Sequence, residues 1–185
     1  MKLVTFFMMM FTTLTVFAAN PTILIKTSMG DIEAELFLDK APETVKNFMS
    51  YVEKGHYKGT IFHRVINNFM IQGGGFDKDL NEKSVGKPIQ NEATNKIKNE
   101  TGTLAMARTQ DLHSATAQFF INVADNSFLD HRDTSMAGFG YAVFGKVTSG
   151  MPVVNKIKAV KTGRRSMYDD VPLDAVVILD ITKKK

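Results

Sequence analysis

The stretch FHRVINNFMIQGGG, residues 62–75, is the most informative in the chain, and the fold assignment depends on it. Aromatic and β-branched residues form two apolar runs, at 61–66 and 69–72, which predict two β-strands. A permanently charged residue, Arg64, lies among these apolar side chains, and three glycines close the stretch. A fixed cation in such surroundings needs an explanation, because a charge is costly to bury without a partner.

Simple alternation along the first of these strands places Phe62, Arg64 and Ile66 on one face. Apolar residues occur on both faces, so the pattern does not decide which face is the core. The glycines at 73–75 lack the following Gly-Lys-Ser/Thr of a phosphate-binding loop, and they predict a tight chain path instead.

The segment before this stretch predicts a hairpin followed by a helix. Residues 22–39 indicate two strands joined by a turn at 28–30, and Ile32, Ala34 and Leu36 alternate with acidic residues in the second strand. In residues 41–57, Pro42 suits a first helical turn, apolar residues recur at helical spacing, and Gly55 marks the end of the helix.

The segment after it predicts mostly β-structure. Strands are expected near 103–107, 118–123, 141–147 and 175–181, with a second, shorter helix near 152–157. Seven or eight strands and two helices without strand–helix alternation indicate an antiparallel barrel or sandwich rather than a parallel sheet. Residues 73–100 carry no clear pattern and predict a long loop that is functional or poorly ordered. Residues 161–170 give no structural prediction.

Length and composition indicate one domain behind an export signal. The chain has 185 residues, 44% of them hydrophobic, which suffices for one substantial core. Residues 1–19 combine Lys2, an apolar run and the small residues Ala18 and Ala19, which is the layout of a secretory signal peptide. We expect cleavage after Ala18 or Ala19 and a mature domain over 20–185. The apolar run is shorter than the roughly 20 residues that span a bilayer, so no stable membrane insertion is expected.

Several function classes find no support. The formal net charge is +4, but the basic residues are spread along the chain apart from a run at 183–185, so no nucleic-acid partner is predicted. The four histidines lack metal-ligand spacing, so neither a metal nor another cofactor is predicted. The chain has no cysteine and no GxSxG motif, which leaves the common covalent nucleophiles unsupported.

Four linked motifs resemble those of the cyclophilins, which are peptidyl-prolyl cis/trans isomerases. They are FHRVINNFMIQGGG at 62–75, GTLAMAR at 102–108, AQFFINVADNSFLD at 117–130 and GYAVFGKV at 140–147, in the family's order. With the export signal, the chain looks most like the periplasmic cyclophilins of Gram-negative bacteria. The resemblance implies a closed eight-stranded antiparallel barrel capped by two α-helices, with the site on its outer face. It also implies a periplasmic enzyme, or alternatively a secreted one.

The resemblance assigns candidate site residues as well. It maps the family's catalytic arginine onto Arg64. The proline pocket maps onto Phe69, Met70, Phe120 and Leu129, the residues that hold the substrate backbone onto Gln72 and Gln118, and the pair that contacts the residue before proline onto Ala107 and Arg108.

Three positions depart from the best-known eukaryotic pattern of the family. Phe128 replaces a tryptophan, Arg108 an asparagine and Tyr141 a histidine. The resemblance implies that Phe128 leaves isomerase activity intact but weakens cyclosporin binding. The direction in which Arg108 shifts peptide preference does not follow from the sequence.

The chemistry of this reaction explains the arginine. Rotation about an X-Pro bond faces a barrier of roughly 18 to 20 kcal/mol, because the nitrogen lone pair is delocalised into the carbonyl. In the twisted transition state the prolyl nitrogen regains its lone pair, so a donor aimed at it binds that state better than either planar isomer. Arg64 is such a donor, and its apolar neighbours exclude water.

Two other interpretations remain open at this stage. A peptide-binding or chaperone module would recognise proline-containing loops without turnover, and an inert structural barrel would carry a substituted pocket. The isomerase interpretation expects proline-containing polypeptide clients and a monomeric protein.

Overall fold

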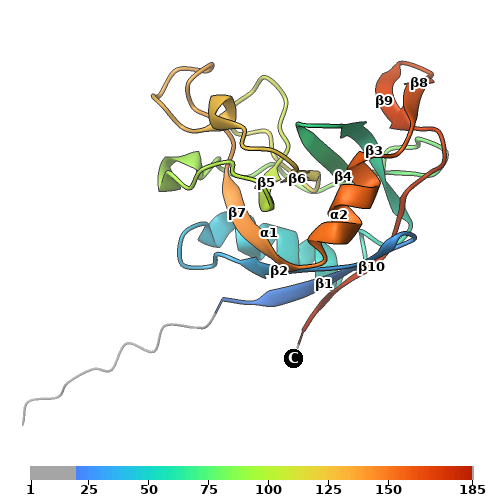
Figure 1. Cartoon of the computed structure of the whole chain (residues 1–185). Coiled ribbons are helices and arrows are strands. Elements are labelled where there is room, and N and C mark those ends of the chain that lie inside the picture. The colour runs from blue at the N-terminus through green and yellow to red at the C-terminus, as the bar shows by residue number, and fades with distance from the viewer. Residues whose placement is uncertain (1–19, 185) are drawn as a thin grey trace, which may run out of the picture.

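The computed structural model describes residues 20–184, so the predicted signal peptide at 1–19 lies outside the described residues. Eight strands close into an antiparallel barrel in the order β1-β10-β3-β4-β6-β5-β7-β2 (Figure 1). These strands are β1 (Thr22–Thr27), β2 (Gly30–Leu36), β3 (Thr60–Ile66), β4 (Met70–Asp77), β5 (Thr103–Met106), β6 (Phe119–Asn122), β7 (Val143–Ser149) and β10 (Val177–Lys183). The predicted eight-stranded barrel is confirmed.

Two helices, α1 (Pro42–Glu53) and α2 (Met151–Lys158), complete the core. The predicted alternation in β2 holds, because Ile32, Ala34 and Leu36 are fully buried and join the barrel interior. Phe48 of α1 and Ile157 of α2 belong to the same apolar cluster. The barrel is stabilised because the strands and both helices remove their apolar faces from water by packing them into one shared interior.

Glu92, in the predicted long loop, caps the start of α1. Pro42 occupies the first turn, as predicted, but the preceding Ala41 supplies no side-chain cap. Instead the Glu92 carboxylate accepts hydrogen bonds from the backbone N–H groups of Glu43 (3.1 Å) and Thr44 (2.8 Å). A carboxylate satisfies the free N–H groups of a helix start and interacts favourably with its dipole, so the loop is anchored where it crosses the helix.

A β-bulge in β3 corrects the alternation predicted for that strand. Phe62 pairs with Gly73, and Arg64 pairs with Gln72, so two steps on β3 match one step on β4. Phe62 and Val65 both face the barrel interior, whereas Arg64 is exposed. The prediction that Phe62 and Arg64 share a face is therefore wrong, because the extra residue of a bulge reverses the direction of every side chain beyond it.

The glycines at 73–75 belong to β4, so the predicted loop at 73–100 begins too early. Each glycine lies where a side chain would collide with a neighbour. A Cβ atom on Gly73 would be 2.9 Å from a backbone oxygen, on Gly74 2.8 Å from the ring of Tyr57, and on Gly75 2.6 Å from the side chain of Gln118. The tight chain path is confirmed, but it lies within a strand rather than in a loop.

A second small sheet was not predicted from the sequence. Strands β8 (Thr162–Arg165) and β9 (Tyr168–Pro172) pair only with each other. Figure 1 shows this hairpin projecting beside β3, away from the helices. Its residues are largely exposed, so the segment lacks the apolar alternation that reveals a strand packed on a core. No helix in residues 20–184 has the length and apolar character needed to cross a membrane.

Candidate active site

The outward faces of five neighbouring barrel strands carry the candidate site. The strand registers place Arg64, Gln72, Phe120, Ala105 and Val143 next to one another in a row across β3, β4, β6, β5 and β7. Directly opposed residues of adjacent strands have Cβ atoms roughly 4.5 to 5.5 Å apart. The pairing of the strands therefore brings side chains from distant parts of the sequence within contact distance.

A second apolar cluster lies on this outer face, separate from the barrel core. Met70, Ala105, Phe120, Leu129 and Val143 are all buried there, and each contacts others of the set. In β6 the neighbours of Phe120 point inward into the barrel, so strand alternation assigns the inner and outer clusters to the two faces of the same sheet. The outer cluster forms the floor of a pocket.

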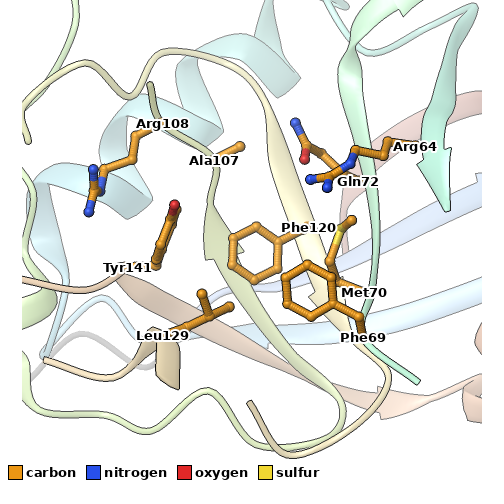
Figure 2. Close-up of a pocket in the computed structure, with 9 residues that line it drawn as sticks. All are labelled: Arg64, Phe69, Met70, Gln72, Ala107, Arg108, Phe120, Leu129 and Tyr141. Carbon is orange, nitrogen blue, oxygen red and sulfur yellow. The ribbon is translucent and has the colours of Figure 1, made fainter. Parts of the chain in front are cut away.

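This pocket has a volume of about 100 Å3. That is well below the roughly 300 to 1,000 Å3 of ordinary small-molecule sites, so it suits one small apolar side chain. Figure 2 shows Arg64 on one side, Arg108 and Tyr141 on the other, and the ring of Phe120 between them. Nine of the eleven predicted site residues line it: Arg64, Phe69, Met70, Gln72, Ala107, Arg108, Phe120, Leu129 and Tyr141.

The two remaining predicted residues lie at its edge. Gln118 lines an adjoining hollow together with Gln72, and the Nε2 group of Gln72 donates a hydrogen bond of 3.0 Å to Oε1 of Gln118. Phe128 is 61% exposed, and its ring lies 5.5 Å from the ring of Phe69, centroid to centroid. Phe128 therefore extends the apolar wall outward instead of lining the floor.

The Arg64 guanidinium is accessible at the pocket. Its side chain is 44% exposed, and its Nε atom lies 3.9 Å from a carboxylate oxygen of Asp170 in β9. This separation is too long for a hydrogen bond. In Figure 2 the terminal nitrogens of Arg64 point toward Gln72, above Met70 and Phe120. The carboxylate therefore lies beside the guanidinium but does not block its terminal N–H donors.

Arg108 is held in place on the opposite side. Its Nε donates to the carbonyl of Gly140 (3.2 Å) and its Nη1 to the carbonyl of Thr109 (3.0 Å). The guanidinium carbon lies 4.6 Å from the ring centroid of Tyr141, within the range of a cation–π contact. Arg108 and Tyr141, two of the three residues that depart from the eukaryotic pattern, thus contact each other and form one wall together.

A buried network of asparagines supports the pocket, and sequence reasoning missed it. Asn126 donates to the carbonyl of Phe69 (2.9 Å) and to the side chain of Asn122 (2.7 Å), which in turn donates to Asn99 (3.2 Å). Asn99 donates to the carbonyl of Leu129 (3.1 Å). Asparagine is usually a turn or surface residue, so only the fold shows that these three are interior and fix two pocket walls.

His63, next to the arginine, is buried and does not reach the pocket. Its ring packs against Phe76, with centroids 4.7 Å apart, and its Nδ1 atom has no hydrogen-bond partner. Burial, assisted by the positive charge of Arg64, lowers the pKa of His63 from 6.5 to about 4. The imidazole is therefore a neutral packing group at ordinary pH. The described residues 20–184 contain no cluster of three or more potential metal ligands.

A closed antiparallel barrel with a small apolar pocket and an arginine on its outer face defines a protein of the cyclophilin type. The family model "Cyclophilin type peptidyl-prolyl cis-trans isomerase/CLD" matches residues 22–183. The chain belongs to this family, and it is a peptidyl-prolyl cis-trans isomerase.

Relatives from bacteria are similar over most of the chain. Peptidyl-prolyl cis-trans isomerase B of Escherichia coli (strain K12) is 59% identical over 156 residues, covering 84% of this chain and 95% of the relative. Peptidyl-prolyl cis-trans isomerase A of Dickeya dadantii (strain 3937) is 53% identical over 164 residues, covering 88% and 85%.

The fold also matches solved structures. A Cryptosporidium parvum cyclophilin type peptidyl-prolyl cis-trans isomerase superimposes with a TM-score of 0.73 at 28% identity, covering 90% of this chain and 98% of the other. A crystal structure of the same protein in the presence of the dipeptide Ala-Pro gives a TM-score of 0.71, also at 28% identity, with coverage of 89% and 99%.

Proposed function

We propose that this isomerase acts in the periplasm on proline-containing segments of newly exported polypeptides. The observation that carries the substrate class is the pocket itself, which offers one small apolar hollow with a cation at its side and a pair of amides at its edge. The Cryptosporidium parvum structure obtained with Ala-Pro supports a proline ring as the occupant. The signal-peptide composition of residues 1–19 supports the location.

In this proposal Arg64 is the catalytic residue. With the proline ring against Phe120 and Met70, the terminal N–H groups of Arg64 lie beside the prolyl nitrogen. They donate to that nitrogen most strongly when the amide is twisted and the lone pair is localised on it. A charged donor in a partly dry site forms a stronger hydrogen bond than a neutral one. No covalent step or added cofactor takes part.

The paired glutamines hold the backbone on one side of the rotating bond. Because Gln72 donates to Gln118, the Oε1 atom of Gln72 keeps its acceptor capacity and the Nε2 group of Gln118 keeps its donor capacity. Together they offer one acceptor and one donor to a substrate peptide unit. Because this peptide unit is held in place, the proline side of the bond rotates relative to a fixed partner.

A refolding experiment tests the substrate class. A protein whose refolding is limited by an X-Pro bond is refolded with the mature enzyme, with Arg64→Ala and with no addition. The proposal expects the wild type to accelerate the slow refolding phase. With Arg64→Ala, the slow phase is expected to proceed at nearly the rate seen with no enzyme. Equal protection from aggregation by both proteins, with no effect on the slow phase, would favour a binding module without turnover and would contradict the proposal.

A fractionation experiment tests the location. The full chain is expressed in a Gram-negative host, and the mass of the product is measured in the periplasmic and cytoplasmic fractions. The proposal expects a processed chain that starts at Ala19 or Asn20 in the periplasm. Unprocessed protein confined to the cytoplasm would contradict it.

A further inference from the structure

The β8–β9 hairpin brings a carboxylate to the arginine. Oδ2 of Asp170, in β9, lies 3.9 Å from Nε of Arg64. Among residues 20–184, this is the only ion pair of the Arg64 guanidinium, and no hydrogen bond from it reaches another protein group. This carboxylate lies on the Nε side of the guanidinium. The terminal nitrogens of Arg64 are directed toward the pocket (Figure 2).

The hairpin is held against the barrel by aromatic packing and a hydrogen bond. The ring of Tyr168 meets the ring of Phe76 edge to face at 5.2 Å, and Phe76 meets His63 in the same manner at 4.7 Å. Nη1 of Arg165 donates to the carbonyl of Lys78 (2.9 Å). The Tyr168 contact joins β9 to β4, the Arg165 hydrogen bond joins β8 to the residue that follows β4, and the Phe76–His63 contact links this packing to β3. The position of the carboxylate relative to the arginine is therefore fixed by packing.

The backbone at Asp170 is itself unusual. Its φ angle is +60°, in the left-handed region that residues other than glycine, asparagine and aspartate rarely adopt. Because asparagine tolerates the same conformation and has the same shape, Asp170→Asn removes the charge with little change to the backbone.

We infer that Asp170 is a positioning residue, which orients the Arg64 guanidinium toward the prolyl nitrogen. The inference rests on the proposed catalytic role of Arg64. Both side chains are about two-fifths exposed, at 44% and 42%, and the pair is too long for a hydrogen bond, so the coupling is modest. A modest, nondirectional attraction restricts the arginine without competing for the donors that the twisted amide needs.

The test compares two neighbouring aspartates of the same hairpin. Oδ1 of Asp169 lies 3.8 Å from Nε of Arg164, and both of these side chains are 73% exposed. Asp169→Asn therefore removes the same charge from the same strand without touching the Arg64 pair. For an Ala-Pro peptide we expect Asp170→Asn to lower kcat by about threefold to fivefold and to leave KM within about twofold. Asp169→Asn is expected to match the wild type in both.

A double-mutant cycle separates positioning from a loss of structure. In an Arg64→Ala background, Asp170→Asn is expected to cause no further fall in kcat, because the group that it orients is absent. A fall of the same size in both backgrounds, or a wild-type kcat for Asp170→Asn, would overturn the inference while leaving the role of Arg64 intact. Wild-type activity of Arg64→Ala alone would instead overturn the proposed mechanism and the inference with it.

Discussion

The buried imidazole of His63 predicts a specific loss of stability at mildly acidic pH. Its pKa is about 4 in the folded protein and about 6.5 when the chain is unfolded. Between these values the unfolded chain binds a proton that the folded protein excludes, so acid favours unfolding. The stabilisation is complete above the unfolded pKa and decreases as the pH falls toward the folded pKa.

The size of this effect follows from the two pKa values. Linkage gives a decrease of about 2.5 kcal/mol in the free energy of unfolding between about pH 7.5 and about pH 4.5. His56 also has a lowered pKa, chiefly because of its burial, and it contributes in the same direction. A variant that removes only His63 therefore isolates its part of the decrease.

The perturbation is His63→Phe, which keeps an aromatic ring against Phe76 and removes the unpartnered Nδ1 atom. Urea unfolding at the two pH values gives the free energy of unfolding of both proteins. The variant is expected to lose about 2.5 kcal/mol less than the wild type on acidification. In the wild type, an NMR titration should place the pKa of His63 near 4. Equal losses in both proteins, together with a titration near 6.5, would refute the reasoning.

Two further substitutions test the supports of the pocket. Asn126→Ala removes one of the two donors to the carbonyl of Phe69 and leaves the buried Oδ1 atom of Asn122 without its donor, so urea unfolding is expected to show a loss of about 2 to 3 kcal/mol, and a loss below about 0.5 kcal/mol would contradict the structural role. Gly75→Ala places a Cβ atom 2.6 Å from the side chain of Gln118 and displaces it, so KM for an Ala-Pro peptide should rise. Gly86→Ala, whose Cβ atom has its nearest neighbour at 3.5 Å, is the matched control, and equal KM values for these two variants would contradict the account.

Strand alternation and helix signals predicted the barrel core well. Ile32, Ala34 and Leu36 are buried as expected, and α1 ends just before Gly55. These features depend on local periodicity and backbone preference, which are determined by residues close together in the sequence. Closure into eight strands, by contrast, was implied by the family resemblance, since local pattern alone left a barrel and a sandwich open.

Features that depend on a partner strand could not be predicted. The bulge before Arg64 exists only in the register between β3 and β4, and it decides that the arginine faces outward. The sequence around Gly75 suggests a loop, and only the structure shows that the side chain of Gln118 packs against Gly75 and leaves no room for a Cβ atom. Asp170 lies more than 100 positions from Arg64 in the chain, so no local pattern connects them.

The candidate site residues were predicted from the resemblance, and the topology of the barrel brings most of them to one pocket. Each pocket residue, taken alone, has an ordinary structural interpretation, and Phe120 or Met70 would suit any apolar core. Their outward direction follows from alternation only after the inner face is known. The register then brings Arg64, Gln72 and Phe120 side by side, which the spacing in the sequence does not show.

The most direct test of the central claim is the cis/trans exchange rate of an Ala-Pro peptide bound to Arg64→Ala, measured by NMR at saturating enzyme. If Arg64 stabilises the twisted amide, the rate on the enzyme should fall by about 10² to 10³ while the peptide dissociation constant stays within about threefold of the wild type. A folded variant that exchanges the bound peptide at the wild-type rate would contradict the account.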